Sequence, residues 1–424
     1  MKVLIISHNP ITTYQSMGKT MLSLFSEFSP EELCQLYIYP SLPDVEACCS
    51  YFRITDRNVL QSYFRFGKMD AKCITAEQID RTKHDFYESK DDEKFLNKRK
   101  TSWRVLARDL MWKCANWYSR SLKLWLAEQK PDRIFLAPGS SKFIYDIALR
   151  ICKDLQIPIV TYVCDEFYFV NPPKTFSGKI QLRLLKKKIR KLMKASTNLV
   201  TICDELSEAY SREFDLPATT ILTGTNYPIA EGPVLKQEIF GITYLGNLAY
   251  GRLTSVLDVG KALMEINQER NTAYKLFLYT RSLSEEQQNA LTQVPTVEYC
   301  GYVTGETFEN VLHGADMLLH IEDFSPEAID RVKHSVSTKI ADSLGSGIPL
   351  FAYAPDAIAS VTYLKKHNAC FVATEKNMLT NALRNALDLQ NRTAVSQRAI
   401  ETAQRYHCSE TNSRKLYGIL KALN

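Results

Sequence analysis

The six residues STKIAD, from Ser337 to Asp342, place two hydroxyls, a cation and an acid within little more than one helical turn. The pattern predicts a short helix over residues 338–344, with Ser337 or Thr338 as its cap. Free amides of the first turn and Lys339 would then form a compact positive site that suits a phosphate. Asp342 would lie close to that face and could accept both hydroxyls of a ribose. A capped helix whose Lys339 and Asp342 are solvated is an equally good local interpretation.

Two apolar stretches of the second half of the chain end in a glycine. TYLG ends at Gly246 and is followed by Asn247 and Arg252, while VEYCG ends at Gly301 and is followed by Tyr302. A glycine at the end of a strand lets a ligand approach the backbone closely. Arg252 could hold a diphosphate with its forked guanidinium, and the backbone at Gly301 could pair with the edge of a nucleobase. An ordinary β–α turn is the alternative at both places.

The first half of the chain holds a second group of candidates. Gly18 and Lys19 stand where a loop meets the start of a helix. Asp165 and Glu166 follow a buried strand, where a carboxylate is well placed to contact the hydroxyls of an acceptor or a donor. His8 ends the first strand. The alternatives are an ordinary turn for Gly18, a helix-capping acid for Asp165 and a loop histidine for His8.

These residues must be positioned by alternating strands and helices. Continuous apolar strands separated by helices indicate parallel sheets that are covered on both faces, hence an α/β protein. Ligands of such sheets bind beyond the carboxyl ends of the strands. We predict a poorly periodic loop with some helix over residues 65–100 and one long helix over residues 101–129. The expected strands are 2–7, 34–40, 51–55, 132–139, 158–164, 198–203 and 219–224, then 240–246, 274–280, 297–303, 316–322, 349–354 and 369–374.

The segment TNYPIAEGPVLKQE interrupts this alternation. It holds two prolines and one glycine and has no hydrophobic period, which is typical of a linker. We therefore predict an N-terminal Rossmann-like domain over residues 1–226 and a C-terminal Rossmann-like domain over residues 235–405.

Composition restricts the class of protein. The chain has 424 residues, of which 45% are hydrophobic and 24% charged, and its net charge is +6. This suits two or three globular domains. The eleven cysteines form no CxxC pair, which favours reduced, mostly buried thiols. No apolar segment is long enough to span a membrane, so we expect a cytoplasmic protein, or one attached only to a membrane surface.

Two basic segments indicate what that surface could be. Residues 177–194 contain eight basic residues and no acid, with Leu182, Leu185, Ile189 and Leu192 at helical spacing. Residues 98–126 are also basic and carry all four tryptophans, a combination found at membrane interfaces. We expect the apolar faces to pack on the protein and the charges to attract anionic lipid. A nucleic acid is the rival partner, but no binding motif supports it and we expect none.

Several of these stretches together resemble a known family. TYLGNL, EYCGYVTGETFENVLHGADMLLH and STKIADSLGSGIPLF are similar to the C-terminal domain of GT-B glycosyltransferases, especially glycosyltransferase family 4 of bacterial polysaccharide and capsule biosynthesis. The resemblance implies two Rossmann-like domains whose parallel sheets face a central cleft. The N-terminal domain would take the acceptor and the C-terminal domain the nucleotide-sugar donor. A last helix, residues 409–424, would pack back on the N-terminal domain.

The resemblance also implies an activity. A hexosyltransferase-like enzyme would move a sugar from a nucleotide diphosphate to a saccharide acceptor, lipid-linked and at the inner membrane face, with retention. It would use no cofactor or metal, because helix amides and basic side chains carry the phosphate charge. The family has two glutamates eight positions apart, where this chain has His334 and Asp342, and an arginine where it has Asn247. Asp165 and His334 are the residues expected near the reacting sugar, and Asp342 keeps the ribose role.

Two other functions fit the same resemblance. One is a nucleotide-sugar 2-epimerase, which needs several acids and histidines around the sugar. The other is a non-catalytic GT-B protein that binds a partner glycosyltransferase, since the first glutamate of the family motif is absent.

Overall fold

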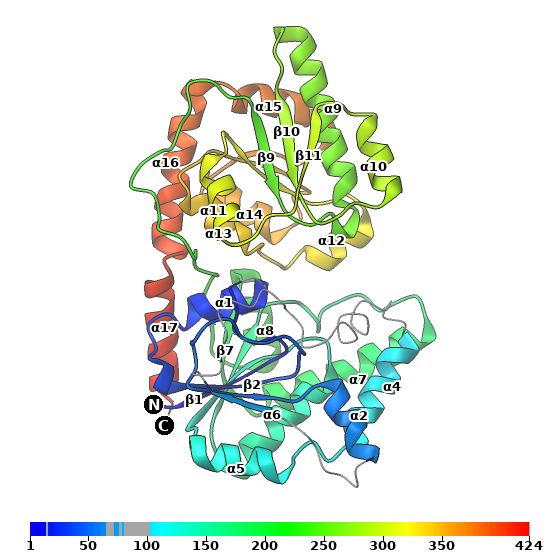
Figure 1. Ribbon diagram of the computed structural model, residues 1–424, viewed down its shortest axis with the longest axis vertical. Coiled ribbons are helices and arrows are strands. Elements are labelled where there is room, and N and C mark those ends of the chain that lie inside the picture. The colour runs from blue at the N-terminus through cyan, green and yellow to red at the C-terminus, as the bar shows by residue number, and fades with distance from the viewer. Residues whose placement is uncertain (14–15, 65–71, 76–78, 80–101, 424) are drawn as a thin grey trace. The chain divides into compact units, whose positions relative to one another are not determined.

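The computed structural model describes residues 1–13, 16–64, 72–75, 79 and 102–423 (Figure 1). The chain divides into two compact units. Unit 1 comprises Met1–Ile221 and Ser413–Asn424, and unit 2 comprises Leu222–Asn412.

Unit 1 is built on an eight-stranded sheet in the order β4-β3-β2-β1-β5-β6-β7-β8. All neighbouring strands are parallel except β3 and β4. The central strands are buried on both faces, as their continuous apolar sequences predict. The strands are β1 (Val3–Ser7), β2 (Leu33–Tyr37), β3 (Ser50–Arg53), β4 (Lys72–Thr75), β5 (Arg133–Ala137), β6 (Ile159–Val163), β7 (Ser196–Thr201) and β8 (Ala218–Thr220).

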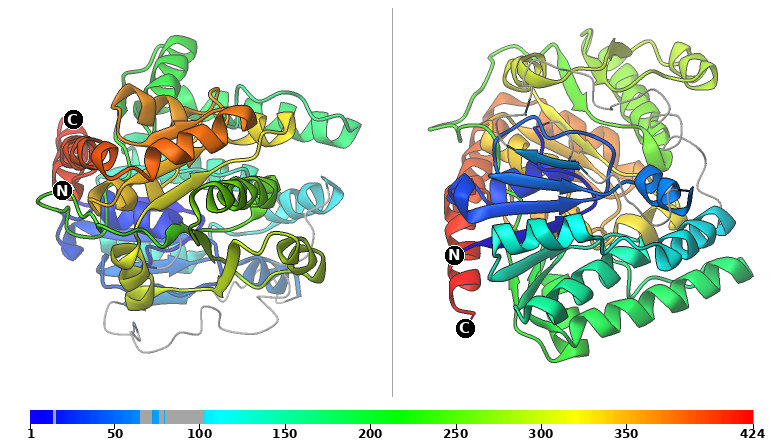
Figure 2. Two further views of the ribbon diagram at one scale, coloured as in Figure 1. Left: turned by 90° about the horizontal axis from the view of Figure 1, so that it is seen from above. Right: turned by 60° about the horizontal axis from the view of Figure 1, so that its bottom comes forward.

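Helices flank this sheet (Figures 1 and 2). They are α1 (Ser16–Leu24), α2 (Asp56–Phe64), α4 (Ser102–Cys114), α5 (Arg120–Gln129), α6 (Lys142–Leu155), α7 (Phe176–Met193) and α8 (Asp204–Phe214). The prediction of one long helix over residues 101–129 is wrong. The chain leaves the helix after Cys114, and Ser119 then caps a second helix by accepting a hydrogen bond from the amide of Leu122.

Two further predictions concern this part of the chain, namely the loop of residues 65–100 and the tryptophans. Strand β4 lies within the predicted loop of residues 65–100, and the rest of that loop, except residue 79, lies outside the described residues. Trp112 and Trp125 are core residues, which confirms for these two side chains the expectation that the apolar faces pack on the protein. Trp112 stacks on Phe143 at 4.1 Å between ring centroids.

Unit 2 is built on a six-stranded, all-parallel sheet in the order β11-β10-β9-β12-β13-β14. Its strands are β9 (Gly241–Leu245), β10 (Lys275–Tyr279), β11 (Val297–Gly301), β12 (Leu318–Ile321), β13 (Leu350–Tyr353) and β14 (Phe371–Ala373). Its helices are α9 (Arg252–Arg270), α10 (Glu285–Thr292), α11 (Gly305–Gly314), α12 (Pro326–Val332), α13 (Lys339–Gly345), α14 (Ala359–Lys366), α15 (Leu379–Ala386) and α16 (Leu389–Tyr406).

The last helix, α17 (Ser409–Lys421), begins in unit 2 and ends in unit 1. Leu416 and Leu420 are fully buried in the hydrophobic core of unit 1. The amide of Glu27 donates to the hydroxyl of Ser413 at 3.0 Å, and Arg133 donates to the carbonyl of Leu423 at 2.6 Å. The end of the chain is therefore an integral part of unit 1.

The strand orders show where ligands are expected. In unit 1 the order reverses between β1 and β5, and in unit 2 between β9 and β12. At such a reversal the connections leave toward opposite faces of the sheet, which opens a crevice at the carboxyl ends of the two strands.

All eleven cysteines are free thiols. Four of them, Cys34, Cys48, Cys164 and Cys203, are buried, five are half-buried and two are exposed. The prediction that most are buried is therefore wrong, because several occupy helix ends and sheet edges.

Candidate functional site

The loop that follows β9 is held in one shape by its own polar groups. The hydroxyl of Tyr244 donates to the carbonyl of Asn247 at 2.7 Å, and the side-chain oxygen of Asn247 accepts from the amide of Ala249 at 3.1 Å. The amide of Gly246 donates to the carbonyl of Tyr279 on the neighbouring strand at 3.0 Å. The carboxyl end of β9 is thus fixed to both its own loop and its neighbour.

Gly251 closes this loop and begins the helix that follows. Its φ of +83° belongs to the left-handed region, which costs a glycine least. A Cβ atom here would also lie 2.6 Å from the carboxyl carbon of Asp323. The loop therefore needs a glycine at this position for two independent reasons, and it delivers Arg252 to the first position of α9.

Arg252 is held by a carboxylate from β12's end. Its Nε and Nη2 donate to the two oxygens of Glu322 at 2.8 Å each, and its Nη1 donates to the side-chain oxygen of Asn247 at 2.8 Å. The two side chains are 14% and 7% exposed. Burial lowers the pKa of Arg252, but the hydrogen bonds and charge of Glu322 outweigh it and the pKa is raised. This fork joins the two strand ends at the reversal of strand order.

Lys339 brings a second cation to the same place. A Cβ atom at Gly246 would collide with its Nζ and would lie 2.6 Å from the hydroxyl of Tyr244. The Nζ also stands 5.7 Å from the ring centre of Tyr244. The absence of a side chain at Gly246 thus allows the ammonium group to approach the end of β9.

His320 completes this cluster from within β12. It is 8% exposed, and its Nε2 has no hydrogen-bond partner among the described residues. Burial lowers its pKa to about 4; the charge of Glu322 opposes this, while those of Arg252 and Lys339 add to it. The imidazole is therefore neutral at neutral pH.

This arrangement suits an anionic ligand, part of which contacts the protein backbone at Gly246. It combines two cations with a strand end that lacks a side chain, at the crevice that the strand order predicts. The charge of Arg252 is largely compensated by Glu322, so Lys339 contributes most of the positive field. We call the group formed by Tyr244, Gly246, Asn247, Arg252, His320, Glu322 and Lys339 the β9–β12 cluster.

Helix α13 differs from its sequence-based interpretation. Thr338 precedes the helix with α-helical dihedral angles (φ −59°, ψ −23°) and its side chain makes no capping hydrogen bond, so the predicted hydroxyl cap is wrong. The amide of Ser337 donates to the hydroxyl of Ser360 at 3.1 Å. The residue before the helix is therefore bonded to α14, while the amides of the first turn of α13 stay candidates for a phosphate.

Asp342 contacts the segment that connects the two sheets. Its Oδ1 accepts from the hydroxyl of Thr225 at 3.1 Å and from the amide of Asn226 at 3.3 Å, and the residue is 7% exposed. The amide of Thr225 in turn donates to the carbonyl of His407 at 2.8 Å. These contacts give Asp342 a structural task at the position expected to hold a ribose.

The remaining candidates of unit 2 lie outside the β9–β12 cluster. Gly301 and Tyr302 end β11, two strands from β9 and so about 10 Å away. The carbonyl of Gly301 accepts from the amide of Thr280 at 2.8 Å, and Tyr302 is exposed beneath Arg281. His334 lies half-buried between α12 and α13.

The candidates of unit 1 follow two strands, β1 and β6. Gly18 is buried in the first turn of α1, where a Cβ atom would collide with the Thr12 hydroxyl. Asp165 follows β6 and is exposed, although partial loss of hydration raises the pKa of its carboxyl. Glu166 caps its own loop, accepting from the amide of Phe169 at 2.7 Å. His8 follows β1 and lies close to Gly139, at the reversal of strand order.

Sequence reasoning missed three members of the β9–β12 cluster, namely Tyr244, His320 and Glu322. The signal for Glu322 was present, because an acid directly follows a buried strand in a loop where ligands were expected. The adjacency of β12 and β9 was not available, and without it Glu322 could not be assigned to Arg252.

Within the described ranges, no three or more His, Cys, Asp or Glu residues are grouped in a way that could hold a metal ion. No helix among these residues combines the length and apolar composition needed to cross a membrane.

Comparison with known proteins identifies the fold. No protein-family model and no curated protein sequence matches the chain. Its structure is similar to that of HepE from Anabaena in complex with UDP, with a TM-score of 0.63, 11% identity and 100% of both chains covered.

Two further structures are similar over nearly the whole chain. One is an α,α-trehalose-phosphate synthase (UDP-forming) from Burkholderia xenovorans in complex with glucose-6-phosphate (TM-score 0.58, 11% identity, 99% of this chain and 100% of that chain). The other is a proposed UDP-N-acetylglucosamine 2-epimerase from Listeria monocytogenes (TM-score 0.56, 13% identity, 99% and 96%). These likenesses confirm the predicted fold class: the chain has the GT-B fold, with two Rossmann-like domains.

Proposed function

We propose that this protein is a glycosyltransferase that moves a hexose from a nucleotide diphosphate to a saccharide acceptor. The observation that carries the proposal is the β9–β12 cluster, which brings Lys339 and Arg252 to a glycine-ended strand at the reversal of strand order. The full-length likeness to structures that contain UDP or glucose-6-phosphate supports it.

The chemistry of such a transfer suits the cluster. When the bond between the sugar and the diphosphate breaks, negative charge grows on the leaving phosphate, and fixed cations stabilise that charge more than they stabilise the donor. Lys339 supplies an ammonium group beside the end of β9, and the fork from Glu322 holds Arg252 in one orientation. These cations would take the role that a metal ion has in other sites where a diphosphate is the leaving group, so the proposal needs no metal.

The finer parts of the proposal follow the family resemblance. We place the enzyme with family 4, with retention at the anomeric carbon, where the leaving phosphate helps to deprotonate the acceptor. Asp165 and His334 are the residues proposed to contact the reacting sugar or its acceptor. The acceptor is proposed to be lipid-linked and to belong to polysaccharide biosynthesis at the cytoplasmic face of a membrane.

The binding part of the proposal is tested by calorimetry with the common nucleoside diphosphates. Lys339→Ala should weaken binding of the best of them by about 1.5–3 kcal/mol, the range for hydrogen bonds to charged groups. Lys261→Ala on the exposed side of α9 is the matched control and should leave the affinity unchanged. If no nucleoside diphosphate binds, or if both variants bind as the wild type does, the donor site is not the β9–β12 cluster.

A nucleotide-sugar 2-epimerase is the second candidate. It is favoured by the imidazole and two carboxylates at the end of β12, His320, Glu322 and Asp323, and by the likeness to the Listeria protein. Incubation of UDP-sugars without acceptor separates the functions by their products in proton NMR. A transferase releases free sugar and UDP slowly, an epimerase yields a second UDP-sugar, and a non-catalytic partner protein yields neither.

A further inference from the structure

Helix α7 presents three different faces. Leu185, Ile189 and Leu192 are buried against unit 1, as their spacing predicts. Phe176, Ile180 and Leu184 recur every four residues and so share another face. They are 81%, 37% and 42% exposed, so this second apolar stripe does not serve the core.

A basic stripe runs beside the exposed apolar stripe. Lys179, Arg183, Lys187 and Lys191 also recur every four residues, and all are exposed. Each of the first three stands three residues after a member of the apolar stripe, so the two stripes are neighbours on the helix surface. Helix α7 contains no acidic residue that could neutralise them.

Two other basic residues of α7 have tasks within the fold. Lys188 forms an ion pair with Asp146 on α6, and Arg190 donates to the hydroxyl of Tyr168 at 2.7 Å. They account for part of the charge that the sequence assigned to a membrane, and they are excluded from the surface described below.

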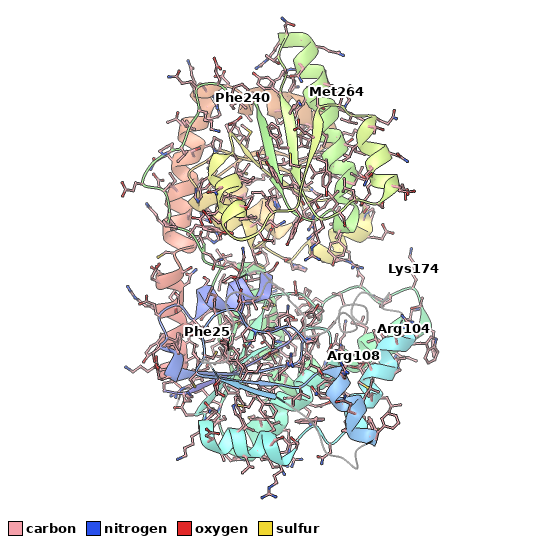
Figure 3. The ribbon with its side chains drawn as sticks, in the orientation of Figure 1. Phe25, Arg104, Arg108, Lys174, Phe240 and Met264 are labelled. Carbon is pink, nitrogen blue, oxygen red and sulfur yellow. The ribbon has the colours of Figure 1, made fainter. Side chains whose placement is uncertain are left out.

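Helix α4 extends the same surface. It packs against α7 and exposes Trp103 and Leu110, which are 75% and 61% exposed and seven residues apart on one face. Its one acidic residue, Asp109, forms an ion pair with Lys142. Figure 3 labels Arg104 of α4 and Lys174, which precedes α7; both lie toward the same end of the two helices.

We propose that the outward faces of α4 and α7 dock on an anionic lipid bilayer. Helices of this kind lie in the plane of the membrane, with the apolar side chains among the acyl chains and the basic side chains at the headgroups. An exposed tryptophan, phenylalanine and aliphatic stripe beside unneutralised basic residues meets both requirements. A nucleic acid would use the basic stripe but would gain nothing from Ile180 and Leu184, since stacking on bases needs aromatic rings.

The docking surface has one consequence for the acceptor. This consequence rests on the proposed function, whereas the docking itself does not. A lipid-linked acceptor is confined to the bilayer, whereas a nucleotide-sugar donor is soluble. Docking would raise the local concentration of the acceptor without a permanent anchor. Binding to lipid itself requires neither donor nor acceptor, so it can be measured separately from transfer.

The experiment is co-sedimentation of the full chain with vesicles of phosphatidylcholine, either alone or mixed with phosphatidylglycerol. We expect binding to the mixed vesicles that weakens as salt increases, because the Debye length falls from about 10 Å at 0.1 M to about 3 Å at 1 M. Replacing Lys179, Arg183, Lys187 and Lys191 by glutamine should weaken binding about 100-fold or more, at roughly fivefold per charge. Lys153, Lys261, Lys415 and Lys421 are also exposed, and their replacement by glutamine is the matched control.

The apolar stripe is tested in the same assay. The triple variant Phe176→Ser, Ile180→Ser, Leu184→Ser should lose most of its binding while retaining the melting temperature of the wild type. Phe240→Ser, Met378→Ser, Leu389→Ser is its control, because these side chains of unit 2 are 65%, 47% and 42% exposed. Donor hydrolysis by the triple variant should equal that of the wild type.

Several results would overturn the proposal. They are equal binding to vesicles without phosphatidylglycerol, unchanged binding by either stripe variant, or binding to a mixed-sequence RNA but not to vesicles. Failure of donor hydrolysis in the wild type would contradict the proposed transferase and leave the lipid result standing. If the wild type hydrolyses donor normally but does not bind vesicles, the lipid proposal is contradicted and the transferase proposal stands.

Discussion

Two neighbouring regions of unit 2 were both expected to hold a nucleotide, and they differ in what their residues contact. The loop after β9 looked like an ordinary turn with a surface arginine, yet it forms a dense polar group around Arg252 and Glu322. Helix α13 had the stronger local signal, yet the Ser337 amide that precedes it bonds to Ser360 and its Asp342 bonds to Thr225. Of its residues, Lys339 is the one that reaches the first region.

The difference teaches that, in this chain, the strand end gathers converging polar side chains, whereas polar groups at and before the helix start bond to other segments. The loop after β9 is defined by its strand, since the chain must turn there and the neighbouring strand fixes what it meets. A short helix offers several polar side chains at once, and any nearby segment can use them. We therefore propose the β9–β12 cluster as the anion-binding site and propose a structural role for Asp342.

The largest expected effect comes from cutting the fork between Arg252 and Glu322. Glu322→Ala leaves a guanidinium that is 14% exposed without its carboxylate, which should cost about 3–5 kcal/mol in the free energy of unfolding. Urea denaturation measures the loss. The control is Glu298→Ala, which removes the partner of Lys275 in a pair whose side chains are both 47% exposed, and it should cost about 0–1 kcal/mol. Similar costs for the two variants would mean that the fork is not a buried pair in solution.

Each region also contains one buried histidine. His320 lies in the β9–β12 cluster, and the carbonyl of His407 accepts from the amide of Thr225, whose hydroxyl donates to Asp342. The Nδ1 of His407 is 2.7 Å from the carbonyl of Thr223, and its Nε2 is 2.9 Å from the hydroxyl of Tyr363. Burial lowers both pKa values from 6.5 to about 4; the Thr223 carbonyl partly opposes this for His407. Between about pH 4 and pH 6.5, each of these histidines is therefore protonated in the unfolded chain but neutral in the folded chain.

Stability should therefore be complete above pH 6.5 and should fall as the pH approaches 4, by up to about 1.4 kcal/mol per pH unit for each histidine. Urea denaturation over this pH range measures the slope. His320→Gln and His407→Gln should each remove about half of it. A slope that neither variant changes would show that carboxylates elsewhere control the acid sensitivity.

Variants of the two regions should differ in their effects when ligand binding and stability are both measured. Lys339→Ala should weaken nucleoside diphosphate binding by about 1.5–3 kcal/mol with little loss of stability. Asp342→Ala leaves the Asn226 amide without its acceptor and removes one of the two acceptors of the Thr225 hydroxyl, so it should lower the free energy of unfolding by about 1–3 kcal/mol. Its effect on affinity should be small. If Asp342→Ala instead loses affinity and keeps its melting temperature, the carboxylate holds the ribose after all.

The sequence predicted elements whose signal is local and continuous. The apolar strands appear where expected, because burial on both faces leaves a pattern that does not depend on distant segments. The break between α4 and α5 was missed, since Ser119 acts as a cap only once the chain has left the first helix. The β4 strand was missed because a four-residue edge strand has too short a pattern to recognise.

The site was harder to predict than the fold, for a physical reason. Gly246, Asn247, Arg252 and Lys339 were identified by residue type and by position at strand or helix ends. Their partner Glu322 is 70 residues from Arg252, and Thr225 is 117 residues from Asp342. Such pairs depend on the order of strands in the sheet and on the path of the connecting segment, neither of which leaves a local pattern.

The smallest expected effect tests the missing cap of α13 directly. Thr338→Ala should change the free energy of unfolding by less than about 0.5 kcal/mol, because its hydroxyl accepts no capping hydrogen bond. Ser284→Ala removes a cap that accepts from the amide of Gln287 at 3.3 Å, and it should cost about 1 kcal/mol. Both lie in unit 2 and both are measured by urea denaturation. If the two variants lose the same free energy of unfolding, the hydroxyl of Thr338 does cap helix α13. A stable Thr338→Ala protein that binds nucleoside diphosphate more weakly would show that this hydroxyl contacts the ligand and would enlarge the β9–β12 cluster by one residue.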